Sequence, residues 1–124
     1  MSMTAPDDAP EVRKARGAFF TPPPIAAFIA NWAIASSTDT VLEPSMGDAE
    51  FLTHAVERLA DLGNGEPTVW GSELHPYSAE VGIARVREAG GKAVVKVGDF
   101  FDRPVEQRFT VVIGNPPYIR FQDF

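Results

Sequence analysis

The sequence predicts an α/β domain with a doubly wound, mostly parallel sheet that is truncated after about four strands. Short β-branched runs alternate with stretches whose apolar residues recur at helical spacing, and this alternation is typical of a parallel sheet. Glycines follow two of the helical stretches, where a helix commonly ends. With 124 residues, 44% hydrophobic and 23% charged, the composition is that of one globular domain.

The chain opens with a segment that we expect to carry no structure. Residues 1–12 are polar, contain prolines and lack periodicity, so we interpret them as a disordered lead-in to a domain at 13–124. They show no signal-peptide pattern, and no apolar stretch approaches the roughly 20 residues of a membrane span. Cysteine is absent, which fits a cytoplasmic protein, and two histidines alone cannot make a metal cluster.

The first helix is expected to begin at a threonine followed by prolines. Thr21 is a candidate N-cap, and Pro22 suits the first helical position. Four large apolar residues then recur at helical spacing and predict one buried face: Ile25, Phe28, Ile29 and Trp32.

Four strands and two further helices are expected after it. The strands are 40–43, 68–73, 93–97 and 109–113. The first crossover helix has an apolar stripe from Phe51 to Leu62 and is closed by Gly63, and the second runs from 76 to 89 and ends at Gly90. Right-handed crossovers place the first strand beside the fourth, where the winding reverses. A ligand is therefore expected outside the carboxyl ends of these strands, at the loops 43–51 and 114–118.

The most specific motif is Asn115-Pro116-Pro117-Tyr118, directly after the fourth predicted strand. The sequence here resembles the adenine-N6 DNA methyltransferases, whose catalytic signature is Asp or Asn, two prolines and an aromatic residue. An aromatic amine is a poor nucleophile because its lone pair is delocalised into the ring. Acceptors on its N–H bonds localise that lone pair, and the Asn115 oxygen and the Pro116 carbonyl would supply them. The resemblance implies that a flipped adenine stacks on Tyr118.

The first strand-to-helix loop is similar to the S-adenosylmethionine loop of that family, which reads acidic-Pro-x-x-Gly-x-Gly-x-Phe. Glu43, Pro44, Gly47 and Phe51 match it, and they would bring the backbone close to the methionine part of the cofactor. Ala49 replaces the second glycine. Because an alanine at positive φ costs roughly 1 kcal/mol, we expect the loop to follow a different path there.

Three further positions are cofactor contacts in this interpretation. Glu73 ends the second strand, where a carboxylate suits a ribose diol, although a solvated strand end is an equal alternative. The resemblance assigns Asp99 to the adenine amino group and Phe100 to the adenine ring, with one of Phe100 and Phe101 packing in the core. Thr21 lies in a motif that helps to close over the methionine moiety.

The order of these motifs resembles the TaqI-like arrangement, in which a target-recognition domain follows the catalytic half. The resemblance implies a Rossmann-like methyltransferase fold, of which this chain carries the N-terminal portion. Restriction-modification or a related defence system is the implied setting. The net charge of −6 opposes binding to a polyanion, so DNA contacts are expected from regions outside this chain, and the chain alone is expected to be inactive.

Two other functions remain open. Glutamine-N5 methyltransferases of release factors also use Asn-Pro-Pro-Tyr, because a carboxamide nitrogen has the same delocalised lone pair. They carry a helical domain before the cofactor loop, whereas 42 residues precede Glu43, and this favours DNA. The other alternative is a non-catalytic fragment that folds and binds a nucleotide-like ligand or a partner chain.

Overall fold

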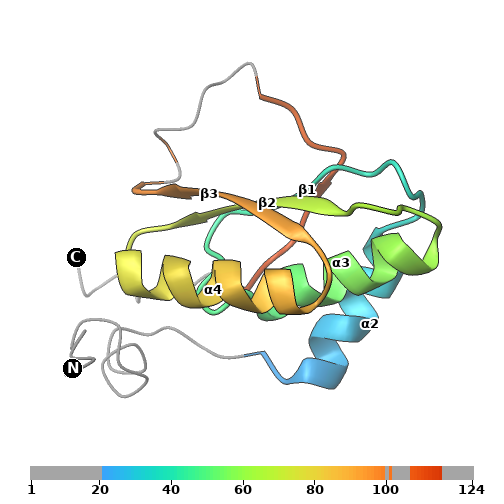
Figure 1. Cartoon of the computed structure of the whole chain (residues 1–124), viewed down its shortest axis with the longest axis horizontal. Coiled ribbons are helices and arrows are strands. Elements are labelled where there is room, and N and C mark those ends of the chain that lie inside the picture. The colour runs from blue at the N-terminus through green and yellow to red at the C-terminus, as the bar shows by residue number, and fades with distance from the viewer. Residues whose placement is uncertain (1–20, 100, 102–106, 116–124) are drawn as a thin grey trace, which may run out of the picture.

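The computed structural model describes residues 21–99, 101 and 107–115. Within them, helices and strands alternate as predicted (Figure 1). The elements are α2 (Pro23–Ala33), β1 (Val41–Glu43), α3 (Glu50–Asp61), β2 (Thr68–Glu73), α4 (Pro76–Glu88), β3 (Lys92–Val97) and β4 (Val111–Val112). The proposed lead-in, Phe100 and the segment from Pro116 to Tyr118 lie outside the described residues.

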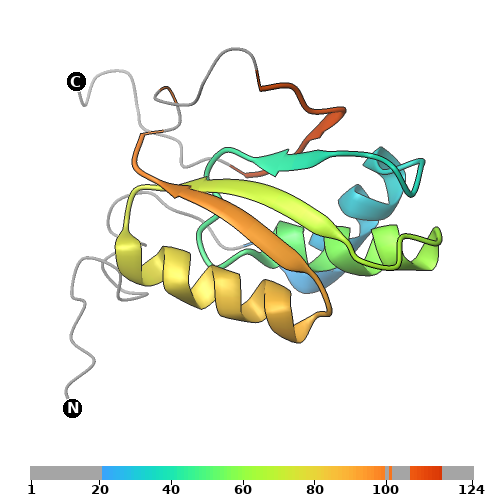
Figure 2. The same ribbon diagram turned by 45° about the horizontal axis from the view of Figure 1, so that its top comes forward.

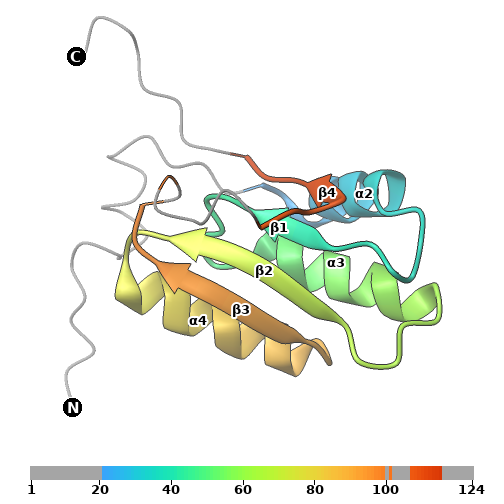
Figure 3. The ribbon, with the colours of Figure 1, turned by 90° about the horizontal axis from the view of Figure 1, so that it is seen from above.

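The four described strands form one parallel sheet in the order β3-β2-β1-β4. Leu42 pairs with Trp70 on one side and with Val112 on the other, so β1 lies between β2 and β4 (Figure 3). The predicted neighbourhood of the first and fourth strands is confirmed. The carboxyl ends of β1, β2 and β4 therefore lie at one edge, where the winding reverses.

All three described helices lie on the same side of the sheet (Figures 1 and 2). Their buried side chains and those of the strands form one core between the two layers. Its largest fully buried residues are Ile34, Leu52, Leu59, Val41, Val56, Val69 and Val86. The opposite face is open in the described part, where Val94 and Val112 are exposed and Trp70 packs edge-on against Phe109 at 5.6 Å.

The N-terminus of α2 differs from the sequence prediction. The helix begins at Pro23, Pro22 is the N-cap, and no side chain caps it. Thr21 cannot do so, because a capping oxygen needs a backbone N–H two or three residues on, and both positions are prolines. The Pro22 carbonyl accepts the first helical hydrogen bonds, from Ile25 and Ala26.

The buried face of α2 also differs from the prediction. Ile25, Phe28 and Trp32 are 51%, 70% and 78% exposed, whereas Ala26 and Ala30 are fully buried. The helix approaches α3 through its small side chains, so its large ones point away from the core. Ile29 alone of the four predicted residues packs partly against the core.

The predicted ends of α3 and α4 are confirmed. Gly63 and Gly90 both have positive φ, and the backbone of each closes a Schellman motif. Strand limits differ slightly from the predictions: β1 begins at Val41, β3 begins at Lys92, and only Val111 and Val112 of the fourth predicted strand are β-structure. Within the described residues, no helix is long and apolar enough to cross a membrane.

Candidate functional site

The loop between β1 and α3 is built into the core. Met46 is 2% exposed, and its backbone N–H donates to the Ser72 carbonyl at 3.0 Å. Its side chain lies over two glycines: a Cβ at Gly71 would come within 2.4 Å of Met46 Sδ, and a Cβ at Gly82 within 2.4 Å of Met46 Cε. Both glycines are required by this close approach, which ties the loop to β2 and α4.

Ala49 takes the left-handed conformation that its residue type disfavours. Its φ and ψ are 68° and 33°, and it is fully buried at the N-cap of α3. The expectation that an alanine would force a different path is therefore wrong: the glycine-like backbone is kept. Its methyl group packs toward Gly82, where a Cβ would lie 3.2 Å away, so burial of the methyl offsets part of the strain.

Glu73 is held by the backbone on both sides. It is 8% exposed, and its Oε1 accepts the Gly47 N–H at 2.8 Å. Its Oε2 accepts the His75 N–H at 3.1 Å. Each oxygen keeps a second lone pair, so the carboxylate is fixed in place while it retains the capacity to accept hydrogen bonds from two hydroxyls.

Glu43 is buried more deeply than Glu73. It is 3% exposed, and its Oε1 has no hydrogen-bond partner among the described residues. Burial raises the pKa of the Glu43 carboxyl well above its ordinary value, and the carboxylates of Asp48 and Glu73 raise it further. A backbone hydrogen bond from Leu52 acts in the opposite direction. The carboxyl end of β1 thus carries a desolvated carboxyl group with one unpaired oxygen.

The segment after β4 lies beside Glu43. A Cβ on Gly114 would lie 3.4 Å from Glu43 Cγ, so the glycine allows the two backbones to approach. The next residue, Asn115, donates its Nδ2–H to Thr21 Oγ1 at 3.2 Å. Two predicted site residues that are 94 positions apart in the chain are therefore in contact.

Residues at the end of β3 are more open. Asp99 is exposed, and its Oδ1 accepts the Phe101 N–H at 2.9 Å. Phe101 is 87% exposed and does not pack in the core. Leu74, which no sequence motif marked, is 62% exposed directly after Glu73. Its position after a strand-end glutamate was readable from the sequence, but its exposure was not.

Phe51 and Pro44 occupy less accessible positions. Phe51 is 3% exposed and belongs to the hydrophobic core, while Pro44 is partly buried. Their roles as cofactor contacts remain predictions. Among the described residues, no cluster of three or more His, Cys, Asp or Glu side chains could hold a metal ion.

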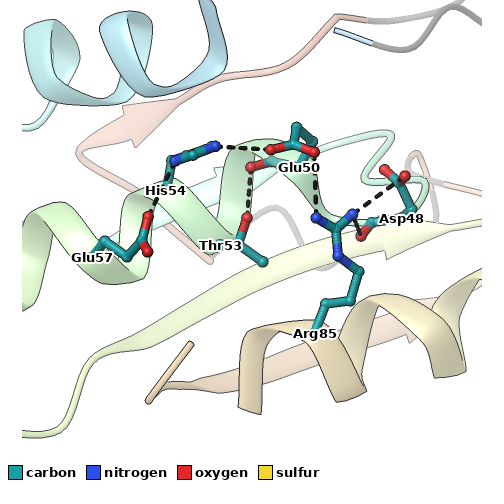
Figure 4. Close-up of polar contacts among 6 residues, drawn as sticks. All are labelled: Asp48, Glu50, Thr53, His54, Glu57 and Arg85. Carbon is teal, nitrogen blue, oxygen red and sulfur yellow. Dashed lines mark hydrogen bonds and ion pairs between the residues drawn. The ribbon is translucent and has the colours of Figure 1, made fainter. Parts of the chain in front are cut away.

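A charged network that sequence reasoning missed supports the start of α3 (Figure 4). Arg85 of α4 donates to the Asp48 carbonyl at 2.9 Å and pairs with the carboxylates of Asp48 and Glu50, each at 3.3 Å. Glu50 also contacts His54 Nε2 at 2.8 Å, and His54 Nδ1 contacts Glu57. The spacing of Glu50, His54 and Glu57 was readable from the sequence, but the contact with Arg85 requires the packing of two helices.

The described residues form a Rossmann-like α/β sheet, with acidic residues at the carboxyl ends of adjacent parallel strands. The N-6 DNA Methylase family matches residues 6–122. The chain therefore belongs to this family, which confirms the resemblance read from its motifs.

Similar proteins agree with this assignment. The chain is 30% identical to the type II methyltransferase M.PaeR7I of Pseudomonas aeruginosa, over 86% of its own length and 24% of that protein. It is 31% identical to M.XhoI of Xanthomonas vasicola, over 85% and 25% of the two chains. A modification subunit of a putative type I restriction enzyme from Vibrio vulnificus superposes with a TM-score of 0.67 at 21% identity, over 86% of this chain and 26% of that one, and supports the fold.

The chain thus spans about a quarter of the length of the curated relatives that it matches.

Proposed function

We propose that this chain supplies the S-adenosylmethionine-binding part and the catalytic motif of an enzyme that methylates the N6 amine of adenine in DNA, in a restriction-modification system. The observation that carries the proposal is the position of Asn115. It follows β4 at the point where the strand order reverses, beside Gly114 and the buried Glu43. The first residue of the Asn-Pro-Pro-Tyr motif thus follows a strand at the kind of position where parallel α/β sheets bind ligands.

The residues present fit the cofactor by their chemistry. Glu73 is a fixed carboxylate with free lone pairs, which suits the ribose hydroxyls. Gly47 has a φ of 53° and no side chain, so its backbone lets a ligand approach closely. Asp99 and the exposed Leu74 would meet the adenine. When bound, the cofactor supplies an electrophilic methyl group on a sulfonium.

Asn115 would then act on the target amine. Its Oδ1 accepts one N–H of the amine, the Pro116 carbonyl accepts the other, and the lone pair is freed for attack on the methyl carbon. Tyr118 offers the flipped base a stacking face. The amine would gain the methyl group that the cofactor supplies and would release one proton to solvent.

Binding of the cofactor can be tested in this chain by calorimetric titration with S-adenosylmethionine. We expect Glu73→Ala to weaken binding about 10- to 100-fold, as the loss of hydrogen bonds to a charged group implies. Glu80→Ala removes the same charge from an exposed position of α4 and serves as the matched control. Equal affinities for wild type and Glu73→Ala would remove Glu73 from the site.

Methyl transfer is tested with labelled cofactor and mixed-sequence DNA. The protein assayed is an enzyme as long as the relatives, which contains residues 1–124. We expect label at adenine N6, and no transfer and no tight DNA binding by residues 1–124 alone, because the net charge is −6 and base flipping costs a few kcal/mol. Label in a release-factor glutamine would support the protein methyltransferase alternative instead. Micromolar DNA binding by the chain alone would contradict the proposed division of labour.

A further inference from the structure

The contact between Thr21 and Asn115 joins the two ends of the described chain. Thr21 directly precedes α2, and Asn115 follows β4. The Asn115 Nδ2–H donates to Thr21 Oγ1 at 3.2 Å, and both residues are partly buried. The local sequence explains why the threonine hydroxyl is available for this bond.

Three prolines keep the Thr21 hydroxyl out of the helix. Pro22, Pro23 and Pro24 follow it, and none of them carries a backbone N–H. The usual task of a threonine before a helix, capping of the first turn, therefore has no donor to satisfy. The hydroxyl oxygen is free to accept from Asn115, and the fixed φ of the prolines holds it at a defined place.

The side-chain amide of asparagine has two ends of similar size and opposite chemistry. The oxygen accepts hydrogen bonds, whereas the nitrogen can only donate them. A target amine must meet the oxygen, because two donors facing each other would leave both N–H groups unpaired. Sterics alone barely distinguish the two orientations, so a neighbouring group has to select one.

We propose that Thr21 is a positioning residue that selects the productive orientation of the Asn115 amide. By accepting the Nδ2–H, it turns Oδ1 away from itself and leaves the oxygen free to accept from the target amine. This inference rests on the proposed function and goes beyond the cofactor contact first expected of Thr21. It gives this residue a role in the rate of methyl transfer in addition to any role in cofactor binding.

An aspartate at position 115 provides the matched control. Both oxygens of its carboxylate accept hydrogen bonds, so a rotation by 180° changes nothing and no selection is needed. Loss of the Thr21 hydroxyl should therefore slow the asparagine enzyme more than the Asn115→Asp enzyme. If Thr21 had a merely structural role, loss of its hydroxyl would slow both enzymes equally.

The hydrogen bond itself is measured in the present chain by NMR of the Asn115 side-chain NH2 group. Its signal is identified by its absence in Asn115→Asp. We expect one slowly exchanging, downfield-shifted proton that persists in Thr21→Ser and is lost in Thr21→Val. An unchanged signal in Thr21→Val, with the fold retained, would overturn the inference.

The kinetic test uses the longer enzyme. We expect Thr21→Val to lower kcat about tenfold, the effect of one hydrogen bond, and Thr21→Ser to stay within about twofold of wild type. In the Asn115→Asp background, Thr21→Val should lower kcat by less than about twofold. An equal loss in both backgrounds, or an unchanged kcat in Thr21→Val, would refute the positioning role.

The two levels of the proposal fail in different ways. A wild-type enzyme that transfers no methyl group to adenine contradicts the proposed function, whatever the NMR shows. An active wild-type enzyme whose rate is indifferent to Thr21→Val contradicts only the inference. If Asn115→Asp is inactive, the positioning role of Thr21 is still tested by the NMR signal and by the kcat values of Thr21→Val and Thr21→Ser.

Discussion

The loop after β1 and the segment after β4 meet at the same edge of the sheet, but different contacts hold them. The loop is fixed by many local ones: Met46 sits over two glycines, Gly47 is bound by Glu73, and Arg85 braces the start of α3. Asn115 is bound through a side chain that lies 94 positions earlier in the chain. The loop after β1 is held within one β-α-β-α unit, whereas Asn115 depends on a long-range contact.

The largest effect is expected where the loop touches β2. Gly71→Ala places a methyl group 2.4 Å from the buried Met46 Sδ and 3.2 Å from Leu52 Cδ1. We expect it to lower the free energy of unfolding by about 1–3 kcal/mol, as overpacking does in cores. Gly65→Ala, with open space around its Cβ, should change it by less than about 0.5 kcal/mol. Urea unfolding measures both, and similar values for the two variants would refute the description of the loop as tightly packed.

A smaller, pH-dependent effect is expected from the buried carboxyl that lies between the two regions. The pKa of Glu43 is raised in the folded state, so between its unfolded and folded pKa values the folded chain binds more protons than the unfolded chain. The stability that Glu43 contributes is complete below the unfolded pKa and is lost as pH rises through the folded pKa. Glu43→Gln cannot titrate and should flatten this decline.

Unfolding by urea from about pH 5 to about pH 8 measures the slope. Glu80→Gln, at an exposed position, should keep the wild-type slope. A wild-type slope in Glu43→Gln would show that other groups cause the decline.

The smallest net effect is expected at Ala49. Ala49→Gly relieves roughly 1 kcal/mol of left-handed strain but loses about 0.8 kcal/mol from burial of one methyl group. Stability should therefore change by less than about 0.5 kcal/mol. Gly82→Ala, whose Cβ would lie 3.2 Å from that of Ala49, should cost less in the Ala49→Gly background than in wild type. Strict additivity in this double-mutant cycle would show that the side chains at positions 49 and 82 do not compete for the same volume.

Much of the fold could be predicted from the sequence because its signals are local. Alternating patterns and the preference for right-handed crossovers gave the neighbourhood of β1 and β4, and Gly63 and Gly90 marked two helix ends. The buried face of α2 was predicted wrongly. A search for apolar periodicity gives weight to large side chains, whereas the contact with α3 is made by Ala26 and Ala30.

The places of the candidate site residues in the fold were predictable from the sequence, but their contacts were not. Glu43, Glu73 and Asn115 follow directly from strand ends and motif spacing. The carboxylate of Glu73 on the Gly47 N–H, the brace of Arg85 on Asp48 and Glu50, and the bond from Asn115 to Thr21 all join distant segments. One correction was within reach of the sequence alone: three consecutive prolines after Thr21 leave no N–H for it to cap.

Those prolines also have a thermodynamic consequence. Each ring locks φ, and Pro22, which precedes the first helical residue, takes an extended ψ of 138°. The joint between Thr21 and α2 therefore has few backbone conformations even in the unfolded chain, so ordering it on folding costs less conformational entropy than ordering a joint without prolines.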